Sequence, residues 1–415
     1  MPTTFRIALL LACSSLIVSA ETPAEQRAAA AQRVIKANPK SSQAYNDLAV
    51  ALTRRARETG DIRFLSQADM ALQQALQLQP GNYDSQKIRI AILLARHQYT
   101  QALEAAKDLN HRVPDDIPVW GMLADANMEL GNYTEAEKDV QWMLDLRPGN
   151  APAFMEAARL RAVFGDVEGA LDFMGETLRR ASENEVEEQA FLLTESAHLQ
   201  LLAGNTKSAG DMLAQALKLF PDYHQALFTL AQLRTGEANY SEAVTLLTRR
   251  NQALQSSASL YDLAEALERS GQKQAAEAAF ETFETRANSE SGNPYNANRE
   301  LVFYYADHRN NAAKALAVAQ REHAARHDVH TQDAYAWALY RNHQFAEAKK
   351  QLDLALAVGV SEPQLFCHAG RIAAALGDKA GADKFMGRAS VAGAPACAAA
   401  DAKVAMTAVH TEPRP

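Results

Sequence analysis

The chain has 415 residues, a formal net charge of −8 at pH 7 and 22% charged residues. Its acidic balance, without a dense cluster of lysine and arginine, argues against nucleic acid as a partner, because phosphate binding needs a concentrated basic surface. Length alone suggests two or three globular domains. Abundant alanine and leucine, with few β-branched runs, favour helices instead.

Residues 1–20 have the pattern of a secretory signal. Arg6 supplies a positive start, residues 7–18 an apolar stretch, and Ala20 ends a small-residue cleavage site. The apolar stretch of about 12 residues is too short to span a bilayer. The sequence therefore predicts an exported protein, periplasmic or secreted.

A second interpretation of this segment stays open. Leu10-Leu11-Ala12-Cys13 resembles the lipobox of bacterial lipoproteins, in which Cys13 would carry a lipid anchor. Against it, the apolar region before the cysteine is short and apolar residues continue beyond it. Both interpretations predict that the chain leaves the cytoplasm.

Most of the remaining chain is a repeat. Residues 21–41 are predicted to form a helix that caps it, and a small residue then recurs at intervals of 33, 34 or 39. The recurring residues are Ala68, Ala102, Ala136, Ala170, Ala209, Ala243, Ala276, Ala315, Ala348 and Ala382. Such a period is typical of a solenoid, in which each unit buries its apolar face against its neighbours.

The unit around Ala136 has the clearest pattern. Trp120, Leu123 and Ala124 share one helical stripe, residues 131–132 supply a turn, and Pro148 stops a second helix. The pattern resembles the tetratricopeptide repeat. The resemblance implies an all-α superhelix of about ten helix–turn–helix units with helical caps, whose first helices line a concave, ligand-binding face.

Two intervals of 39 residues divide this array. One insertion falls near residues 181–185, and the other, at 289–295, separates units 1–7 (residues 42–288) from units 8–10 (residues 296–394). The second insertion is either an ordinary surface loop or a flexible joint. Residues 395–415 are predicted to form a second capping helix and a disordered tail.

The family pattern implies that two side chains of each unit point inward. They lie one and five residues after the position that Trp120 occupies in its own unit, and we call them the first and second inward positions. From unit 1 to unit 10 they are Asn46 and Val50, Lys87 and Ala91, Gly121 and Asp125, Met155 and Arg159, Thr194 and His198, Phe228 and Gln232, Tyr261 and Glu265, Glu300 and Tyr304, Asp333 and Trp337, and Cys367 and Arg371.

The later units of this map contain an aromatic series. Phe228, Tyr261, Tyr304 and Trp337 occupy four consecutive units, interleaved with three carboxylates, Glu265, Glu300 and Asp333. Exposed aromatic rings are frequent anchors of interfaces, and carboxylates beside them favour Lys or Arg on a partner. These seven residues are the predicted peptide-binding site. The alternative is that the rings only pack between helices.

Histidines and cysteines suggest two further features. His323 and His327, four residues apart on a predicted helix, are weak candidates to share a metal ion, and the favoured interpretation is that they are solvated side chains. In an oxidising compartment Cys367 and Cys397 could form a disulfide, or they could simply be small apolar residues in the stack.

No catalytic or cofactor-binding motif appears in the sequence. We therefore expect no enzyme activity and no cofactor. The predicted function is a non-catalytic scaffold or adaptor of the cell envelope that holds a protein or peptide on its concave face. The alternative is a metal-handling accessory protein that uses the histidine-rich C-terminal units.

Overall fold

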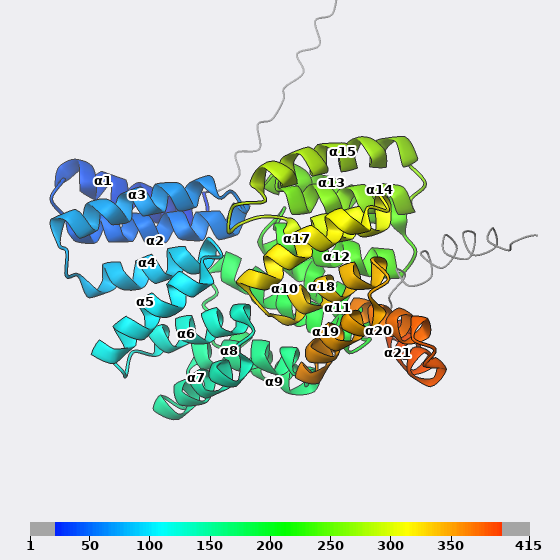
Figure 1. The fold of residues 1–415 in the computed structure, drawn as a ribbon. Helices are drawn as coiled ribbons and strands as arrows, with labels where there is room; N and C mark the ends of the chain where they lie inside the picture. Colours follow the sequence, from blue (N-terminus) through cyan, green and yellow to red (C-terminus); the bar gives the residue numbers. More distant parts are fainter. Residues whose placement is uncertain (1–20, 392–415) are drawn as a thin grey trace, which may run out of the picture.

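The computed structural model describes residues 21–391. In this range the chain forms α-helices and a π-helical turn, without strands (Figure 1). The predicted all-α fold is confirmed.

A single helix, α1 (Pro23–Ala37), precedes the repeated units and packs against α2. Ten pairs of helices follow within the described residues: α2 (Ser42–Thr59) and α3 (Arg63–Leu78); α4 (Tyr83–Ala95) and α5 (Tyr99–Arg112); α6 (Ile117–Leu130) and α7 (Tyr133–Leu146); α8 (Ala151–Val163) and α9 (Val167–Leu178); α10 (Val186–Leu202) and α11 (Thr206–Leu219); α12 (His224–Gly236) and α13 (Tyr240–Leu254); α14 (Ser257–Arg269) and α15 (Lys273–Glu290); α16 (Asn298–Phe303), continued by the π-helical turn η1 (Tyr304–His308), and α17 (Ala312–Ala325); α18 (Val329–Arg341) and α19 (Phe345–Val358); α20 (Pro363–Ala375) and α21 (Lys379–Val391).

The turn inside each unit repeats one backbone conformation. One residue per turn has a positive φ, which ends the first helix and lets the second fold back along it. From unit 2 to unit 10 this residue is His97, Gly131, Gly165, Gly204, Ala238, Gly271, Asn310, His343 and Gly377. Glycine takes this conformation without steric cost, which explains why it recurs in five of these turns.

The small residues that defined the period lie in the core. Nine of the ten alanines, from Ala68 to Ala348, are at most 2% exposed. Because alanine has a single methyl group, paired helices approach closely there, and larger side chains such as Leu72, Leu109 and Met143 fill the space beside them.

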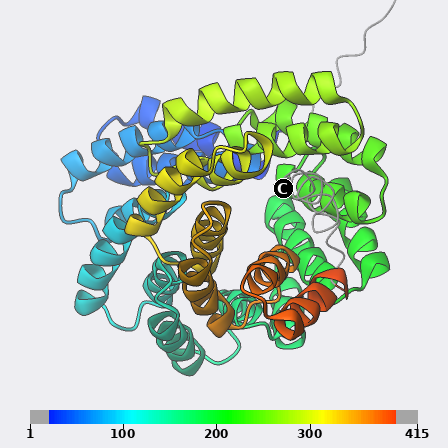
Figure 2. The ribbon, with the colours of Figure 1, turned by 45° about the vertical axis from the view of Figure 1, so that its right-hand side comes forward.

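The stacked units curve into a ring. In Figure 2 the chain runs around this ring, and the helices of the last units, orange and red, lie toward its inside. Two sets of contacts between distant units close the superhelix.

The first contact joins α2 to the start of α10 and to α12. Arg54 Nη1 lies 2.6 Å from Glu185 Oε2, and Arg57 Nε donates to Glu187 Oε1 at 2.7 Å. The backbone oxygen of Arg57 also lies 3.0 Å from His224 Nε2.

The second contact joins the turns of units 3 and 4 to loops of the last units. Tyr133 Oη accepts a hydrogen bond from Val329 N at 2.9 Å, and Leu130 O accepts one from His327 N at 3.3 Å. A Cβ atom on Gly165 would lie 2.2 Å from Gly359 O. We call these contacts the closing contact.

Both insertions touch earlier units. Glu185 pairs with Arg54 as described, and the ring of Tyr295 lies 4.8 Å from that of His97 in the turn of unit 2. One hydrophobic cluster also runs from Leu260 to Ala338, across the second insertion. This continuous core favours the surface-loop interpretation over a flexible joint.

None of the helices between residues 21 and 391 is both long and apolar enough to cross a membrane. The predicted signal, Cys13, Cys397 and the predicted C-terminal cap lie outside the described residues.

Candidate protein-binding surface

The second inward positions of units 3–7 form a continuous accessible row, which we call the inward row. It consists of Asp125, Arg159, His198, Gln232 and Glu265, on α6, α8, α10, α12 and α14. The side chains of Asp125 and Arg159 are each 31% exposed, that of His198 is 38% exposed and that of Glu265 is 32% exposed. Gln232 is exposed. Five successive first helices thus present accessible polar groups at the same position of the repeat.

Arg159 is the centre of an ionic network. It forms a short ion pair with Asp125, lies 2.9 Å from Glu156 and lies 3.6 Å from Glu129. Burial raises the pKa of Glu156, and the nearby charge of Asp125 raises it further. One guanidinium therefore organises three carboxylates on units 3 and 4.

Glu265, at the other end of the row, pairs with the imidazole of His308. His308 Nε2 lies 3.6 Å from Glu265 Oε1, and His308 Nδ1 lies 3.2 Å from Glu268 Oε2. Burial opposes the imidazolium, but both carboxylates favour it and raise the pKa of His308 to about 9. The imidazole is therefore charged at neutral pH.

We expect this pairing to make stability fall as the solution becomes alkaline. The pKa of His308 is raised above the ordinary value of 6.5, so its contribution is complete below that value and is lost as pH rises toward 9. The loss is on the order of 2 kcal/mol. Urea unfolding at pH 6, 7.5 and 9 should show this decline in the wild type and a flatter profile in His308→Gln. Equal slopes in both proteins would contradict it.

The expectation that the aromatic series is exposed is wrong. Tyr261 is 6% exposed, Tyr304 is fully buried and Trp337 is 3% exposed. Phe228 is half-buried, with the Arg250 guanidinium 4.7 Å from its ring centroid. The packing alternative describes these rings correctly.

Two local features explain their burial. In unit 8 the π-helical turn changes the direction of successive side chains, so Tyr304 and Tyr305 are both buried and both donate to Glu284, at 2.7 and 3.0 Å. In unit 9 the ring of His368 stacks on Trp337 at 4.2 Å and covers it.

The remaining predicted carboxylates already have partners. Asp333 Oδ1 lies 2.8 Å from His368 Nδ1 and is buried, and Glu300 lies 3.4 Å from Arg299. Of the seven predicted residues, Glu265 is the one that belongs to the inward row. Whether a ligand binds near the others stays a prediction.

The expectation that His323 and His327 share a helix is also wrong. Helix α17 ends at Ala325, so His327 lies in the following loop, although the two rings remain 4.6 Å apart. Asp328, which follows His327 in the chain, caps α18 by accepting from His330 N and Thr331 N. Between residues 21 and 391 no three His, Cys, Asp or Glu side chains are arranged to hold a metal ion.

Cys367 is 5% exposed and lies near the start of α20. Its predicted disulfide partner, Cys397, is outside the described residues, so the bridge stays a prediction.

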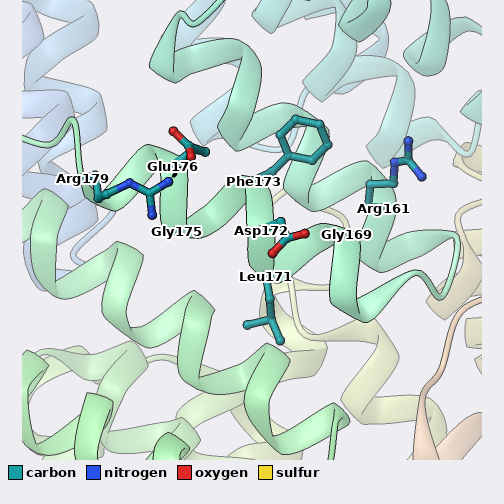
Figure 3. A pocket seen from close by; sticks show the side chains of 8 residues that line it. All are labelled: Arg161, Gly169, Leu171, Asp172, Phe173, Gly175, Glu176 and Arg179. Carbon is teal, nitrogen blue, oxygen red and sulfur yellow. Dashed lines mark hydrogen bonds and ion pairs between the residues drawn. The ribbon is translucent and has the colours of Figure 1, made fainter.

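A shallow hollow lies on α9 (Figure 3). Leu171, Phe173, Asp172, Glu176 and Arg179 line it, and Arg179 pairs with Glu176. It lies mainly on a second helix, and two of its charged groups, Arg179 and Glu176, are paired with each other. We therefore place no binding function there.

The inward row is present among the predicted inward positions but is not part of the predicted peptide-binding site, apart from Glu265. Four of its members, Asp125, Arg159, His198 and Gln232, lack the aromatic character that we took as a sign of binding. A continuous run of polar residues at one repeat position was the signal that could have identified them.

Comparison with protein families supports the repeat assignment. Two tetratricopeptide-repeat family models match residues 93–141 and 122–185. No curated protein matches the sequence.

Solved structures share the fold at low identity. Cut9, in a complex with Hcn1 of the APC/C, superposes with a TM-score of 0.52 and 16% identity over 84% of this chain, which spans 58% of Cut9. Human IFIT1 with m7Gppp-AAAA gives a TM-score of 0.52 and 12% identity over 87% of this chain and 84% of IFIT1. These similarities show the fold alone. The described chain is a tetratricopeptide-like α-solenoid, with tetratricopeptide repeats identified at residues 93–185.

Proposed function

We propose that this protein is a non-catalytic scaffold that holds a protein or peptide along its inward row. The observation that carries the proposal is the uninterrupted series of accessible polar side chains on α6, α8, α10, α12 and α14. Tetratricopeptide folds commonly bind proteins or peptides, and a rigid stack keeps such side chains at regular spacing for a ligand.

The chemistry of the row supports one class of partner over another. Carboxylates stand at its two ends, Asp125 and Glu265, and Arg159, His198 and Gln232 lie between them. Such a surface favours an extended polar segment with both acidic and basic side chains, which exchange hydrogen bonds with the row. An apolar peptide with aromatic anchors fits it less well.

The place of action is part of the proposal. The signal-like residues 1–20, with the lipobox-like alternative at Cys13, support export to the cell envelope. A scaffold in envelope assembly or secretion fits that location by analogy only.

Substitution of the least constrained members of the row tests the proposal. His198 has one weak pairing, 3.9 Å from Glu362, and Gln232 is exposed, so His198→Ala with Gln232→Ala should leave the fold intact. Affinity capture from an envelope extract, followed by titration of the recovered partner, should show at least a tenfold loss of binding.

A matched control separates binding from folding. Gln101→Ala with His111→Ala removes the same residue types from exposed positions on α5, a second helix. This control should bind as the wild type does. If the two double variants bind equally while circular dichroism shows both folded, the inward row is not the site.

A further inference from the structure

A second hollow, of about 500 Å³, lies where unit 2 meets unit 3. Helix α6 packs against both α5 and α7 there (Figure 1). The residues that line it include Lys107 of α5, Trp120 and Asn127 of α6, and Glu135 and Asp139 of α7. We call it the unit 2–3 hollow. Its volume is within the range of known ligand sites.

This hollow is separate from the inward row. Asp125, the member of the row on α6, is five residues after Trp120 and two before Asn127. At 100° per residue it points to a different side of the helix from both of them. A ligand in the hollow would therefore not occupy the inward row.

Asp139 departs from the pattern of the repeat. It lies three residues after the repeated alanine of unit 3, Ala136. At the equivalent position eight of the other nine units have an apolar residue, such as Ala105 in unit 2 and Phe173 in unit 4, and unit 9 has Gln351. Stacking of the units therefore does not require a charge at this position. A local departure of this kind is typical of functional sites.

The Asp139 carboxylate is buried with a single hydrogen bond. Its residue is 8% exposed, and Asn127 Nδ2 donates to Asp139 Oδ2 at 2.8 Å. Asn127 is itself held by Asn132, whose Nδ2 donates to Asn127 Oδ1 at 3.3 Å. Within residues 21–391 the other carboxylate oxygen, Oδ1, accepts no hydrogen bond. Because Asp139 lines the hollow, Oδ1 is left for a ligand.

The basic residues near Asp139 do not compensate its charge. Lys107 lies 3.4 Å from Glu104, and Lys138 lies 2.7 Å from Glu135, so both lysines pair with other carboxylates. Burial raises the pKa of Asp139 to about 6, despite the opposing effects of Asn127 and of the two lysines. A buried carboxylate without a paired cation opposes folding. A cationic ligand would remove that cost.

Trp120 gives the hollow an aromatic wall. Its Nε1 donates to Pro114 O at 2.7 Å, and its ring centroid lies 5.8 Å from that of Trp142. These two contacts hold the half-buried indole in position. Guanidinium groups both stack on aromatic rings and pair with carboxylates, which favours arginine over lysine as the occupant.

We propose that the unit 2–3 hollow is a second docking site, which takes an arginine side chain of a protein partner. The guanidinium pairs with Asp139, and the side chain lies beside the indole of Trp120. Lys107 and Glu135 are exposed at the edge of the hollow, where the residues on either side of the arginine in the partner can contact them. A partner can thus be recognised by two separate surfaces of the solenoid.

Titration with a capped arginine, N-acetyl-L-arginine methylamide, tests the proposal. The indole N–H resonance of Trp120, assigned by its loss in Trp120→Phe, should shift in a saturable way. The same compound with norleucine in place of arginine should produce no shift. Asp139→Asn should weaken binding of the capped arginine roughly tenfold, because a charge-assisted hydrogen bond is lost.

Glu137→Gln is the matched control. Glu137 is an exposed carboxylate of α7 that does not line the hollow, so its replacement removes one negative charge from the same helix. This variant should bind the capped arginine as the wild type does. Equal affinities of Asp139→Asn and Glu137→Gln, or no saturable shift in the wild type, would overturn the proposal. Methylguanidinium that binds as tightly as the capped arginine would assign the hollow to a small cation and overturn docking of a side chain.

Thermal unfolding separates this role from a structural one. The asparagine in Asp139→Asn can still accept from Asn127, and it carries no buried charge. The unfolding midpoint of this variant should therefore equal or exceed that of the wild type. A lower midpoint, or loss of folding, would mean that Asp139 serves the fold and would overturn the proposal. Neither variant changes the inward row, so failure of this site is distinguishable from failure of the proposed function.

Discussion

Replacing Gly165 with alanine should open the ring at the closing contact. Gly165 has φ +78°, and an added Cβ would lie 2.2 Å from the backbone oxygen of Gly359, a distance that real atoms cannot adopt. The obstacle is backbone, so no side chain can rotate away. We expect a loss of roughly 1–3 kcal/mol from this clash, in addition to about 1 kcal/mol from the left-handed conformation.

The repeat supplies a matched control for this change. Gly271 has φ +82° in the corresponding turn of unit 7, and an added Cβ there meets no atom within 4 Å. Gly271→Ala thus carries the backbone cost alone, and its difference from Gly165→Ala isolates the contact between distant units.

Two measurements check this prediction. Small-angle scattering should give a larger radius of gyration for Gly165→Ala than for Gly271→Ala. Amide exchange should accelerate at His327 and Val329, whose N–H groups donate to Leu130 and Tyr133 across the closing contact. Identical exchange in both variants would mean that the ring is not closed in solution.

Replacing Trp337 with alanine should destabilise the protein by about 3–5 kcal/mol. Trp337 is 3% exposed, it stacks on His368, and its Nε1 donates to Asp307 at 3.0 Å. Truncation leaves a large cavity between units 8, 9 and 10 and removes a hydrogen bond from a half-buried carboxylate. Urea unfolding should show this loss directly.

Trp142→Ala provides the control. The Trp142 side chain is on a second helix, is 46% exposed and has one aromatic neighbour, Trp120, at 5.8 Å. Its removal should change stability by no more than about 1 kcal/mol. Comparable losses in the two variants would show that Trp337 is not a core residue.

The burial of the aromatic rings also changes how the predicted peptide-binding site can be tested. Because Tyr304 and Trp337 are core residues, their replacement by alanine would weaken binding through loss of folding. The inward row offers better positions, since His198 and Gln232 can be shortened without removing a buried contact.

The location of the row has a structural consequence. From unit 3 to unit 7 the second inward position is polar and accessible, and from unit 8 to unit 10 it holds Tyr304, Trp337 and Arg371, all buried. A partner bound along the inward row would therefore contact units 3 to 7, while the last units complete the ring.

The repeat, the helix pairs and the alanine core could be predicted from the sequence because they are local. A unit of about 34 residues contains its own turn, its own small residues and its own helix ends, and nine of the ten alanines that set the period are buried. The inward positions could be listed for the same reason. The exposure of the side chains at these positions could not be predicted, because it depends on how the neighbouring units pack.

Only the tertiary structure decided which inward residues are accessible and how the ring closes. A π-helical turn moved Tyr304 into the core, and His368 of the next unit covered Trp337. The contacts of Tyr133 with Val329 and of Gly165 with Gly359 join residues about 195 positions apart. Such contacts depend on the small rotation between successive units, which accumulates along the solenoid and is not encoded in any single repeat.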